Sequence, residues 1–296
     1  MQNNAPYHDA EKNAEKKPAQ KKRLDLLLMD KGFVDTRSRA RGEIMAGNVF
    51  VEGIKQDKAG SLFHTEASIE LRASSNPYVS RGGLKLEKAL REFEIELEGK
   101  TVLDIGASTG GFTHCSLNHG AEKVYALDVG YGQLDWRLRN DDRVINMERT
   151  NARLIKKEDF PELPDLVVID VSFISLALIL PVIAAFPVQE IICLIKPQFE
   201  ATQSQVGKRG VVKDPSVHEE VLKKIMHLAD EQNYLVSGLT HSPLKGPKGN
   251  IEYLIYLKKI KDVAINTEIN YDDISYNEIN ARAAAAVLAA YNDLGT

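Results

Sequence analysis

The chain has 296 residues, of which 43% are hydrophobic and 27% are charged, and its formal net charge is −4. This length and composition allow a full hydrophobic core in one or two domains. The two cysteines, Cys115 and Cys193, exclude a disulfide framework, and the first 25 residues lack the apolar core of a secretory signal. We therefore expect a cytoplasmic protein.

The charge is distributed unevenly along the chain. Residues 16–91 contain 16 Lys or Arg and 9 Asp or Glu, a balance of +7, so the remaining residues sum to −11. A basic front part on an acidic protein indicates a polyanionic partner for that part, although a charge-rich solvated surface gives the same count.

Residues 1–20 are poor in apolar side chains and are expected to be disordered, whereas 21–73 are expected to form a small α+β domain. Thr36 is a predicted N-cap, and Glu52-Gly53 is a predicted hairpin turn. We expect helices over Lys22–Lys31 and Arg37–Met45, and strands over Val49–Val51 and Ser68–Leu71.

A linker is predicted at 74–83, an α/β domain at 84–260, and an acidic, then alanine-rich extension at 261–296. Alternating strand-like and helix-like segments are typical of an open, largely parallel sheet. Strands are expected at Thr101–Asp104, Lys123–Asp128, Val144–Met147, Leu166–Asp170, Glu190–Lys196, Tyr234–Thr240 and Glu252–Leu257, and helices at Leu84–Phe93, Phe112–His119, Ser216–Gln232 and Ala281–Tyr291.

One apolar stretch, Leu166 to Phe186, is long enough to be considered as a membrane span. Its first part is β-branched, Asp170 would be costly in lipid, and Pro181 interrupts a single long helix. We therefore interpret it as a buried strand followed by a buried helix from about Ser175, and we expect no membrane association.

The glycine-rich segment after the first strand of the α/β domain predicts a cofactor site. It reads D-x-G-x-x-x-G-G from Asp104, which lacks the spacing of a dinucleotide fingerprint. Asp128 ends the next strand, 24 positions later, near the offset at which a carboxylate meets ribose hydroxyls. The alternative is an ordinary strand–turn–helix whose glycines serve packing.

Two acids at successive strand ends suit a cationic ligand with an adenosine group, and S-adenosylmethionine is such a ligand. Its carboxylate would meet backbone N–H groups near the turn and the helix start. The expected cofactor-binding residues are Asp104, Gly106, Ala107, Ser108, Thr109, Gly110, Gly111, Phe112, Asp128, Val129 and Asp170. No metal is expected.

Four ionisable residues lie where an open α/β sheet would bring them together, namely Lys85, Asp170, Lys196 and Glu252. The carboxyl ends of parallel strands face one crevice, and an antiparallel last strand would place its beginning there. If the acceptor is a ribose hydroxyl, a neutral lysine can take its proton, and the carboxylates would orient the ammonium groups. Each residue alone is more simply explained as a structural salt bridge.

Basic residues in both domains are candidates for phosphate contacts. Two glycine-punctuated basic loops, 207–210 and 245–250, are expected to face the substrate. On rigid elements, such residues bind RNA with modest selectivity, and a solvent-facing helix is the simpler alternative for the front part. The candidates are Lys22, Arg23, Arg37, Arg39, Arg41, Arg81, Lys208 and Arg209.

Several motifs in one order give a specific resemblance over about 21–260. Thr36 to Gly53 resembles the RNA-binding module of small-subunit ribosomal protein four, and the part from Tyr78 onward is similar to FtsJ-type RNA 2′-O-methyltransferases. The order resembles the TlyA (haemolysin A-like) family, and the motifs are Tyr78 to Leu86, Asp170 to Phe173, Ile195 to Glu200 and Gly249 to Glu252.

The resemblance implies a Rossmann-like S-adenosylmethionine-dependent methyltransferase that acts on a cytidine 2′-hydroxyl of ribosomal RNA. It also implies that the four ionisable residues match the Lys-Asp-Lys-Glu tetrad of FtsJ-type enzymes. The linker reads Asn-Pro-Tyr-Val where some members have Arg-Ala-Trp-Val, and Val-Ser-Phe follows Asp170 instead of Met-Ala-Pro. A membrane-active haemolysin and a non-catalytic ribosome-binding factor are the alternatives. Sequence alone does not give the oligomeric state.

Overall fold

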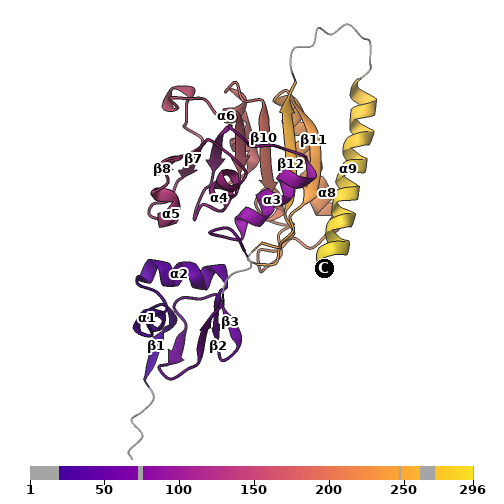
Figure 1. Ribbon diagram of the computed structural model, residues 1–296. Coiled ribbons are helices and arrows are strands. Elements are labelled where there is room, and N and C mark those ends of the chain that lie inside the picture. Colours follow the sequence, from indigo (N-terminus) through magenta and orange to yellow (C-terminus); the bar gives the residue numbers. More distant parts are fainter. Residues whose placement is uncertain (1–19, 73–75, 247, 261–270, 296) are drawn as a thin grey trace, which may run out of the picture. The chain divides into compact units, whose positions relative to one another are not determined.

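The computed structural model describes residues 20–72, 76–246, 248–260 and 271–295 (Figure 1). The chain divides into two compact units, residues 1–75 and 76–296. The predicted disordered tail, apart from Gln20, and the first part of the predicted C-terminal extension lie outside the described residues.

The first unit is a small α+β fold with a two-stranded and a three-stranded sheet. Strand β1 pairs with β4, and β2 pairs with both β3 and β5, all antiparallel. Leu24, Leu28 and Ile44 of its helices are fully buried in its core. Its elements are β1 (Lys21–Arg23), α1 (Leu24–Asp30), α2 (Arg37–Ala46), β2 (Val49–Val51), β3 (Ile54–Gln56), β4 (Leu62–His64) and β5 (Ile69–Leu71).

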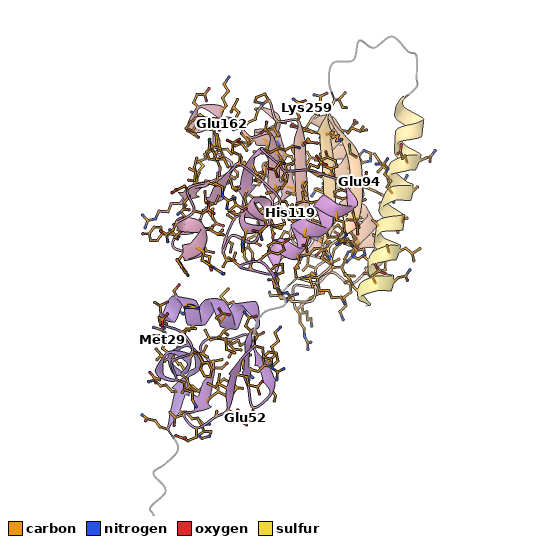
Figure 2. All side chains as sticks on the ribbon, viewed as in Figure 1. Met29, Glu52, Glu94, His119, Glu162 and Lys259 are labelled. Carbon is orange, nitrogen blue, oxygen red and sulfur yellow. The ribbon has the colours of Figure 1, made fainter. Side chains whose placement is uncertain are left out.

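The first helix begins at Leu24, two residues later than the predicted start at Lys22. Lys22 and Arg23 belong to β1, because Lys21–Arg23 pairs with the strand Leu62–His64, which the sequence did not indicate. Thr36 caps α2 as predicted, accepting a hydrogen bond from the Arg39 amide at 3.2 Å. The predicted hairpin turn is also confirmed, since Glu52 (φ 50°) and Gly53 (φ 74°) join β2 to β3 (Figure 2).

The second unit contains a seven-stranded sheet in the order β11-β12-β10-β9-β6-β7-β8. The ladders of β6 to β10 are parallel, whereas β12 is antiparallel to both its neighbours, as predicted for the last strand. Its elements are α3 (Gly82–Glu92), β6 (Thr101–Ile105), α4 (Gly111–Asn118), β7 (Lys123–Asp128), α5 (Trp136–Arg139), β8 (Val144–Glu148), η1 (Lys157–Asp159), β9 (Leu166–Ile169), η2 (Leu176–Leu178), α6 (Leu180–Ala184), β10 (Glu190–Ile195), α7 (Pro197–Glu200), α8 (Pro215–Glu231), β11 (Tyr234–His241), β12 (Tyr253–Lys259) and α9 (Tyr271–Leu294). This confirms the predicted Rossmann-like α/β architecture.

The sheet separates two hydrophobic cores, because successive residues of a strand face opposite sides. Val102 and Val124 pack with Leu86 of α3 and Phe112 of α4 on one face. The adjacent strand residues face the other side, where residues of α6, α8 and α9 complete the larger core (Figure 1).

The apolar stretch at 166–186 forms β9, η2 and α6, so the predicted helix from Ser175 is a 3₁₀ turn followed by a short helix with Pro181 in its first turn. Among the described residues, no helix has both the length and the apolarity of a membrane span. The predicted linker also differs, since Tyr78 is buried in the second unit and α3 begins at Gly82.

Candidate active site

The sheet topology brings three of the four predicted catalytic residues to one edge. Strands β9 and β10 are parallel with Ile169 opposite Cys193, and β10 and β12 are antiparallel with Ile195 opposite Tyr253. Asp170 and Lys196 therefore follow the carboxyl ends of adjacent strands, and Glu252 precedes β12 at the same edge.

The four residues form two ion pairs at this edge of the sheet. Lys196 Nζ lies 2.5 Å from Asp170 Oδ1, and Lys85 Nζ donates to Glu252 Oε2 at 2.6 Å. Lys85 and Lys196 are 9% and 8% exposed, and Glu252 is 1% exposed. Each ammonium group thus has its own carboxylate partner, which orients it and supplies the opposite charge that a buried cation needs.

Two further polar residues belong to this cluster, and the sequence reasoning missed both. Lys196 Nζ donates to Ser172 Oγ at 2.9 Å, and Gln198 Nε2 donates to Glu252 Oε1 at 3.2 Å. Gln198 therefore connects the segment after Lys196 to the Lys85–Glu252 pair. Their position within two residues of a predicted catalytic residue was the available signal.

An aromatic pair, Phe173 and the half-buried Phe199, lies beside Lys196, whose Nζ is 5.9 Å from the centroid of the Phe199 ring. Phe173 is 89% exposed and has a left-handed backbone (φ 64°), and its ring lies 5.0 Å from that of Phe199. A phenylalanine in this conformation is uncommon, and such outliers cluster at functional sites. The pair presents an apolar surface next to the ammonium group of Lys196.

Glu200 fixes the loop that carries Ser172 and Phe173. It is 7% exposed and accepts hydrogen bonds from Ser175 Oγ at 2.5 Å and the Leu176 amide at 2.7 Å. Because Glu200 lies in α7, directly after Lys196, the loops after β9 and β10 are held together.

The glycine-rich turn packs against the same edge. Gly106 has φ 89°, and a Cβ atom there would lie 2.5 Å from the backbone oxygen of Asp170. At the end of β7, Asp128 accepts hydrogen bonds from the Ser108 amide at 2.8 Å and the Gly130 amide at 2.6 Å. The turn therefore contacts both Asp128, which ends β7, and Asp170, which follows β9.

Asp104 is fully buried beneath this turn. Its Oδ2 accepts from Thr113 Oγ1 at 2.7 Å, and its Oδ1 has no hydrogen-bond partner among the described residues. Burial raises the pKa of Asp104 to about 7, and the nearby charge of Asp170 adds to the shift. An unpaired carboxylate oxygen in an acidic surrounding fits a cationic ligand such as S-adenosylmethionine.

The other predicted cofactor residues differ in exposure. Phe112 is 3% exposed and its ring packs in the core, so only its backbone is available to a ligand there. Val129, by contrast, is 75% exposed directly after Asp128. Ser108 is exposed and Gly110 is buried in the left-handed conformation (φ 93°).

In the first unit, three predicted RNA-binding arginines share one buried carboxylate. Asp25 is fully buried, and Arg23, Arg37 and Arg41 lie 2.9, 2.9 and 3.5 Å from its Oδ2. The hydrogen bond from Arg23 holds the pKa of Asp25 well below its usual value. The three arginine side chains remain 40–52% exposed, so Asp25 orients them at the surface.

The remaining basic candidates are divided between the two units. Lys22 pairs with Asp30, and Arg39 lies 3.3 Å from Asp35. In the second unit, Arg81 donates to the Lys245 carbonyl at 3.4 Å, and Lys208 and Arg209 are exposed.

Asn250 connects the two predicted basic loops. Its Nδ2 donates to the Gly210 carbonyl at 2.9 Å, and its Oδ1 accepts from the Val212 amide at 3.0 Å. The loop that contains Lys208 and Arg209 is thereby held against the residues that precede Glu252.

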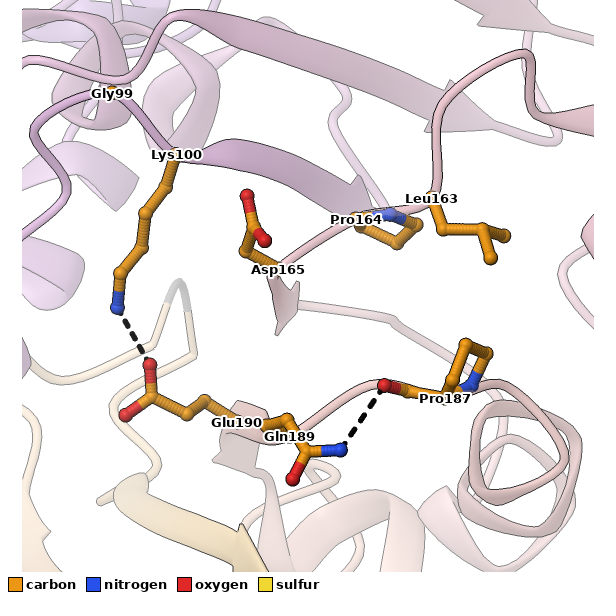
Figure 3. Close-up of a pocket in the computed structure, with 8 residues that line it drawn as sticks. All are labelled: Gly99, Lys100, Leu163, Pro164, Asp165, Pro187, Gln189 and Glu190. Atoms are coloured by element: carbon orange, nitrogen blue, oxygen red, sulfur yellow. Dashed lines mark hydrogen bonds and ion pairs between the residues drawn. The ribbon is translucent and has the colours of Figure 1, made fainter.

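A hollow of about 490 Å³ lies at the opposite, amino end of the strands (Figure 3). Lys100 and Glu190 line it and form an ion pair at 2.6 Å. It is remote from the carboxyl edge and contains none of the predicted site residues.

Comparisons with known proteins identify the family of the chain. The profile of the FtsJ-like methyltransferase family matches residues 78–259. The chain is 42% identical to 16S/23S rRNA (cytidine-2′-O)-methyltransferase TlyA of Mycobacterium tuberculosis, over 84% of this chain and 94% of that protein. It is 46% identical to Hemolysin A of Brachyspira hyodysenteriae, over 79% of this chain and 98% of that protein.

A solved structure supports the same fold. The structure named "Putative hemolysin from Streptococcus thermophilus" superposes with a TM-score of 0.70 at 41% identity, covering 93% of this chain and 98% of that one.

Proposed function

The chain belongs to the FtsJ-like methyltransferase family, and we propose that it transfers the methyl group of S-adenosylmethionine to a cytidine 2′-hydroxyl in ribosomal RNA. The observation that carries this proposal is the convergence of the Lys85–Glu252 and Lys196–Asp170 pairs beside the glycine-rich turn. The substrate is inferred from the TlyA relatives, whose names specify that reaction. Ribosomal RNA as the partner also implies action in the cytoplasm.

The cofactor, when bound, supplies a methyl group on a positively charged sulfur. Asp128 would accept hydrogen bonds from its ribose hydroxyls, since it ends β7 at the offset expected for that contact. The backbone at Gly106 allows close approach because it carries no side chain. Asp104 and Asp170 supply negative charge toward the cationic part of the ligand.

The protein must remove the proton of the ribose 2′-hydroxyl while the hydroxyl oxygen attacks the methyl carbon. Lys196 is the candidate base, and Asp170 and Ser172 hold its amine at the edge of the crevice. Lys85 and Glu252 form the second pair, which adds a cation near the forming alkoxide. Base catalysis contributes about 10²–10⁴-fold, and alignment of hydroxyl and methyl group contributes further.

The RNA would be held by stacking and by charge. Phe173 offers an exposed ring beside Lys196, on which an unstacked base can lie. Arg23, Arg37 and Arg41, oriented by Asp25, are candidates for phosphate contacts in the first unit.

The test is methyl transfer from labelled S-adenosylmethionine to ribosomal subunits prepared from cells that lack the protein. We expect label in a 2′-O-methylcytidine, and we expect Lys196→Ala to abolish it while cofactor still binds. Lys100→Ala, which removes the lysine of the ion pair at the other end of the sheet, is the matched control and should remain active.

The outcomes separate the alternatives. Label that persists in Lys196→Ala would contradict the assignment of the base. RNA binding without cofactor binding would instead support a non-catalytic ribosome-binding factor.

A further inference from the structure

Helix α9 lies beyond the segment that the family profile matches, yet it packs on the second unit. Its Ala283, Ala286 and Ala290 are buried in the larger core, and the helix contacts α8 and β11 (Figure 1). Arg282 donates to the Val236 carbonyl of β11 at 2.6 Å. The small side chains let the helix lie close to the outer strand β11. Its last turn therefore lies at the edge of the sheet where the parallel strands end.

The last turn and the residue after it make three polar contacts there. Tyr291 Oη donates to the Lys213 carbonyl at 2.6 Å, and Asp293 Oδ2 lies 3.0 Å from His241 Nε2. The Gly295 carbonyl accepts from Lys245 Nζ at 2.9 Å. His241 and Lys245 belong to the segment that leads to Glu252, and Lys213 follows Val212, whose amide donates to Asn250 Oδ1.

The contact with Lys245 leads to Glu252. Gly246, the next residue, packs so closely on the Glu252 carboxylate that a Cβ atom there would lie 2.5 Å from Oε1. The Gly246 amide donates to the Asn250 carbonyl, and the Ser242 amide donates to the Glu252 carbonyl, both at 2.8 Å. A shift of Lys245 would therefore move the wall against which Glu252 rests.

The contact with His241 leads to the other member of the pair. Lys88 Nζ lies 3.3 Å from His241 Nε2, and both residues are buried. Lys88 is one turn after Lys85 on α3, so the two side chains lie on neighbouring positions of the same helix face. His241 thus packs against the helix that carries Lys85.

We propose that the last turn of α9 is a positioning element that holds the Lys85–Glu252 pair from both sides. Asp293 acts through His241 and Lys88 on α3, and Gly295 acts through Lys245 and Gly246 on Glu252. Tyr291 holds Lys213, and the adjacent Val212 donates to Asn250, two residues before Glu252. This inference rests on the proposed function for its effect on rate, but the positioning itself does not depend on the RNA substrate.

The test compares Asp293→Ala and Tyr291→Phe with the wild-type enzyme. We expect kcat for methyl transfer to fall about 2- to 30-fold, with the KM for RNA and the Kd for S-adenosylmethionine unchanged. Asp293→Asn, which keeps an acceptor oxygen, should recover most of the rate. Glu278→Ala is the control, because Glu278 is on the same helix but pairs with Arg282 away from the site.

Amide hydrogen exchange in α3 (Gly82–Glu92) and at residues 248–252 is measured on the same variants, since it reports the order of both segments without any RNA. Faster exchange in Asp293→Ala supports the positioning role, including the case in which the wild-type protein methylates no ribosomal RNA and the proposed function fails. Wild-type kcat and wild-type exchange in both variants would overturn the inference. Tyr291→Phe removes a single hydroxyl, so it serves if Asp293→Ala does not fold.

Discussion

The two ends of strand β10 carry ion pairs of nearly the same length and different surroundings. At the carboxyl end, Lys196 and Asp170 lie beside a second buried pair, an exposed aromatic ring and the glycine-rich turn. At the amino end, Lys100 and Glu190 line an open hollow, with side chains 29% and 22% exposed. A lysine–carboxylate pair is therefore a candidate site only through the groups that surround it, because solvent-accessible pairs alone contribute little to stability.

The largest expected difference between the two ends of β10 comes from changing their lysines to arginine. Lys196→Arg keeps the positive charge and can keep the pair with Asp170, but a guanidinium cannot act as a base near neutral pH. We expect the rate constant of methyl transfer, measured in single-turnover assays, to fall at least about 100-fold. Lys100→Arg should stay within about twofold of the wild type. Full activity in Lys196→Arg would show that the residue contributes charge and not proton transfer.

Gly99 and Gly106, near opposite ends of β6, both have left-handed backbones, so alanine substitutions at the two positions can be compared. Gly106→Ala places a Cβ atom 2.5 Å from the Asp170 carbonyl, whereas a Cβ atom at Gly99 meets nothing within 4 Å. We expect Gly106→Ala to weaken S-adenosylmethionine binding by about 3 kcal/mol, or roughly 150-fold, in calorimetric titration. Gly99→Ala should bind it normally. Equal affinity in both variants would remove the turn from the cofactor site.

Asp104 and Asp141 are expected to change the free energy of unfolding in opposite directions as the pH rises. Burial raises the pKa of Asp104 to about 7. Between about pH 4 and pH 7 this carboxyl is therefore protonated in the folded protein and ionised in the unfolded chain. The free energy of unfolding consequently falls as the pH rises through this range. Asp104→Asn removes this loss. We expect the variant to be on the order of 2 kcal/mol more stable than the wild type at pH 8, with no gain at pH 4.

The matched change is Asp141→Asn, before β8 at the amino end of the sheet. The hydrogen bond from Arg143 lowers the pKa of Asp141, so this carboxylate stabilises the fold above its unfolded pKa and loses that effect as pH falls. The variant should be less stable than the wild type at pH 8 and equal to it in acid. Denaturant unfolding at pH 4, 6 and 8 measures both variants, and a pH-independent difference for Asp104→Asn would contradict its raised pKa.

The smallest expected effect concerns the exposed ring. Phe173→Ala should raise the KM for RNA by about 1–2 kcal/mol, or 5- to 30-fold, because it removes a stacking surface. Stability should change little, since the side chain is 89% exposed. Leu178→Ala, which removes another exposed apolar side chain (51%) nearby in sequence, is the control and should leave the KM unchanged. If both variants behave alike, Phe173 has no special role in RNA binding.

Most of the α/β elements followed from the sequence because their signals are local. Apolar runs of strand length are bounded by glycine and acidic residues, and the predicted strand boundaries of the second unit agree with the structure to within about two residues. The strands β1, β3 and β4 of the first unit were not predicted, because none of them has an uninterrupted apolar run like Val49–Val51, and β1 and β4 form by pairing with each other.

The sequence identifies the residues of the candidate site: the glycine-rich turn, Asp128, the three ionisable residues Asp170, Lys196 and Glu252 beside strand ends or starts, and Lys85 in the helix before the first strand of the α/β domain. The way these residues pair follows from the folded chain alone. Lys85 pairs with Glu252 and Lys196 with Asp170, Asp25 gathers three arginines, and α9 reaches the loop before Glu252. Apart from the Arg23–Asp25 pair, these contacts join positions 12 or more residues apart, and their distances depend on sheet order and loop packing, which no local pattern of residues encodes.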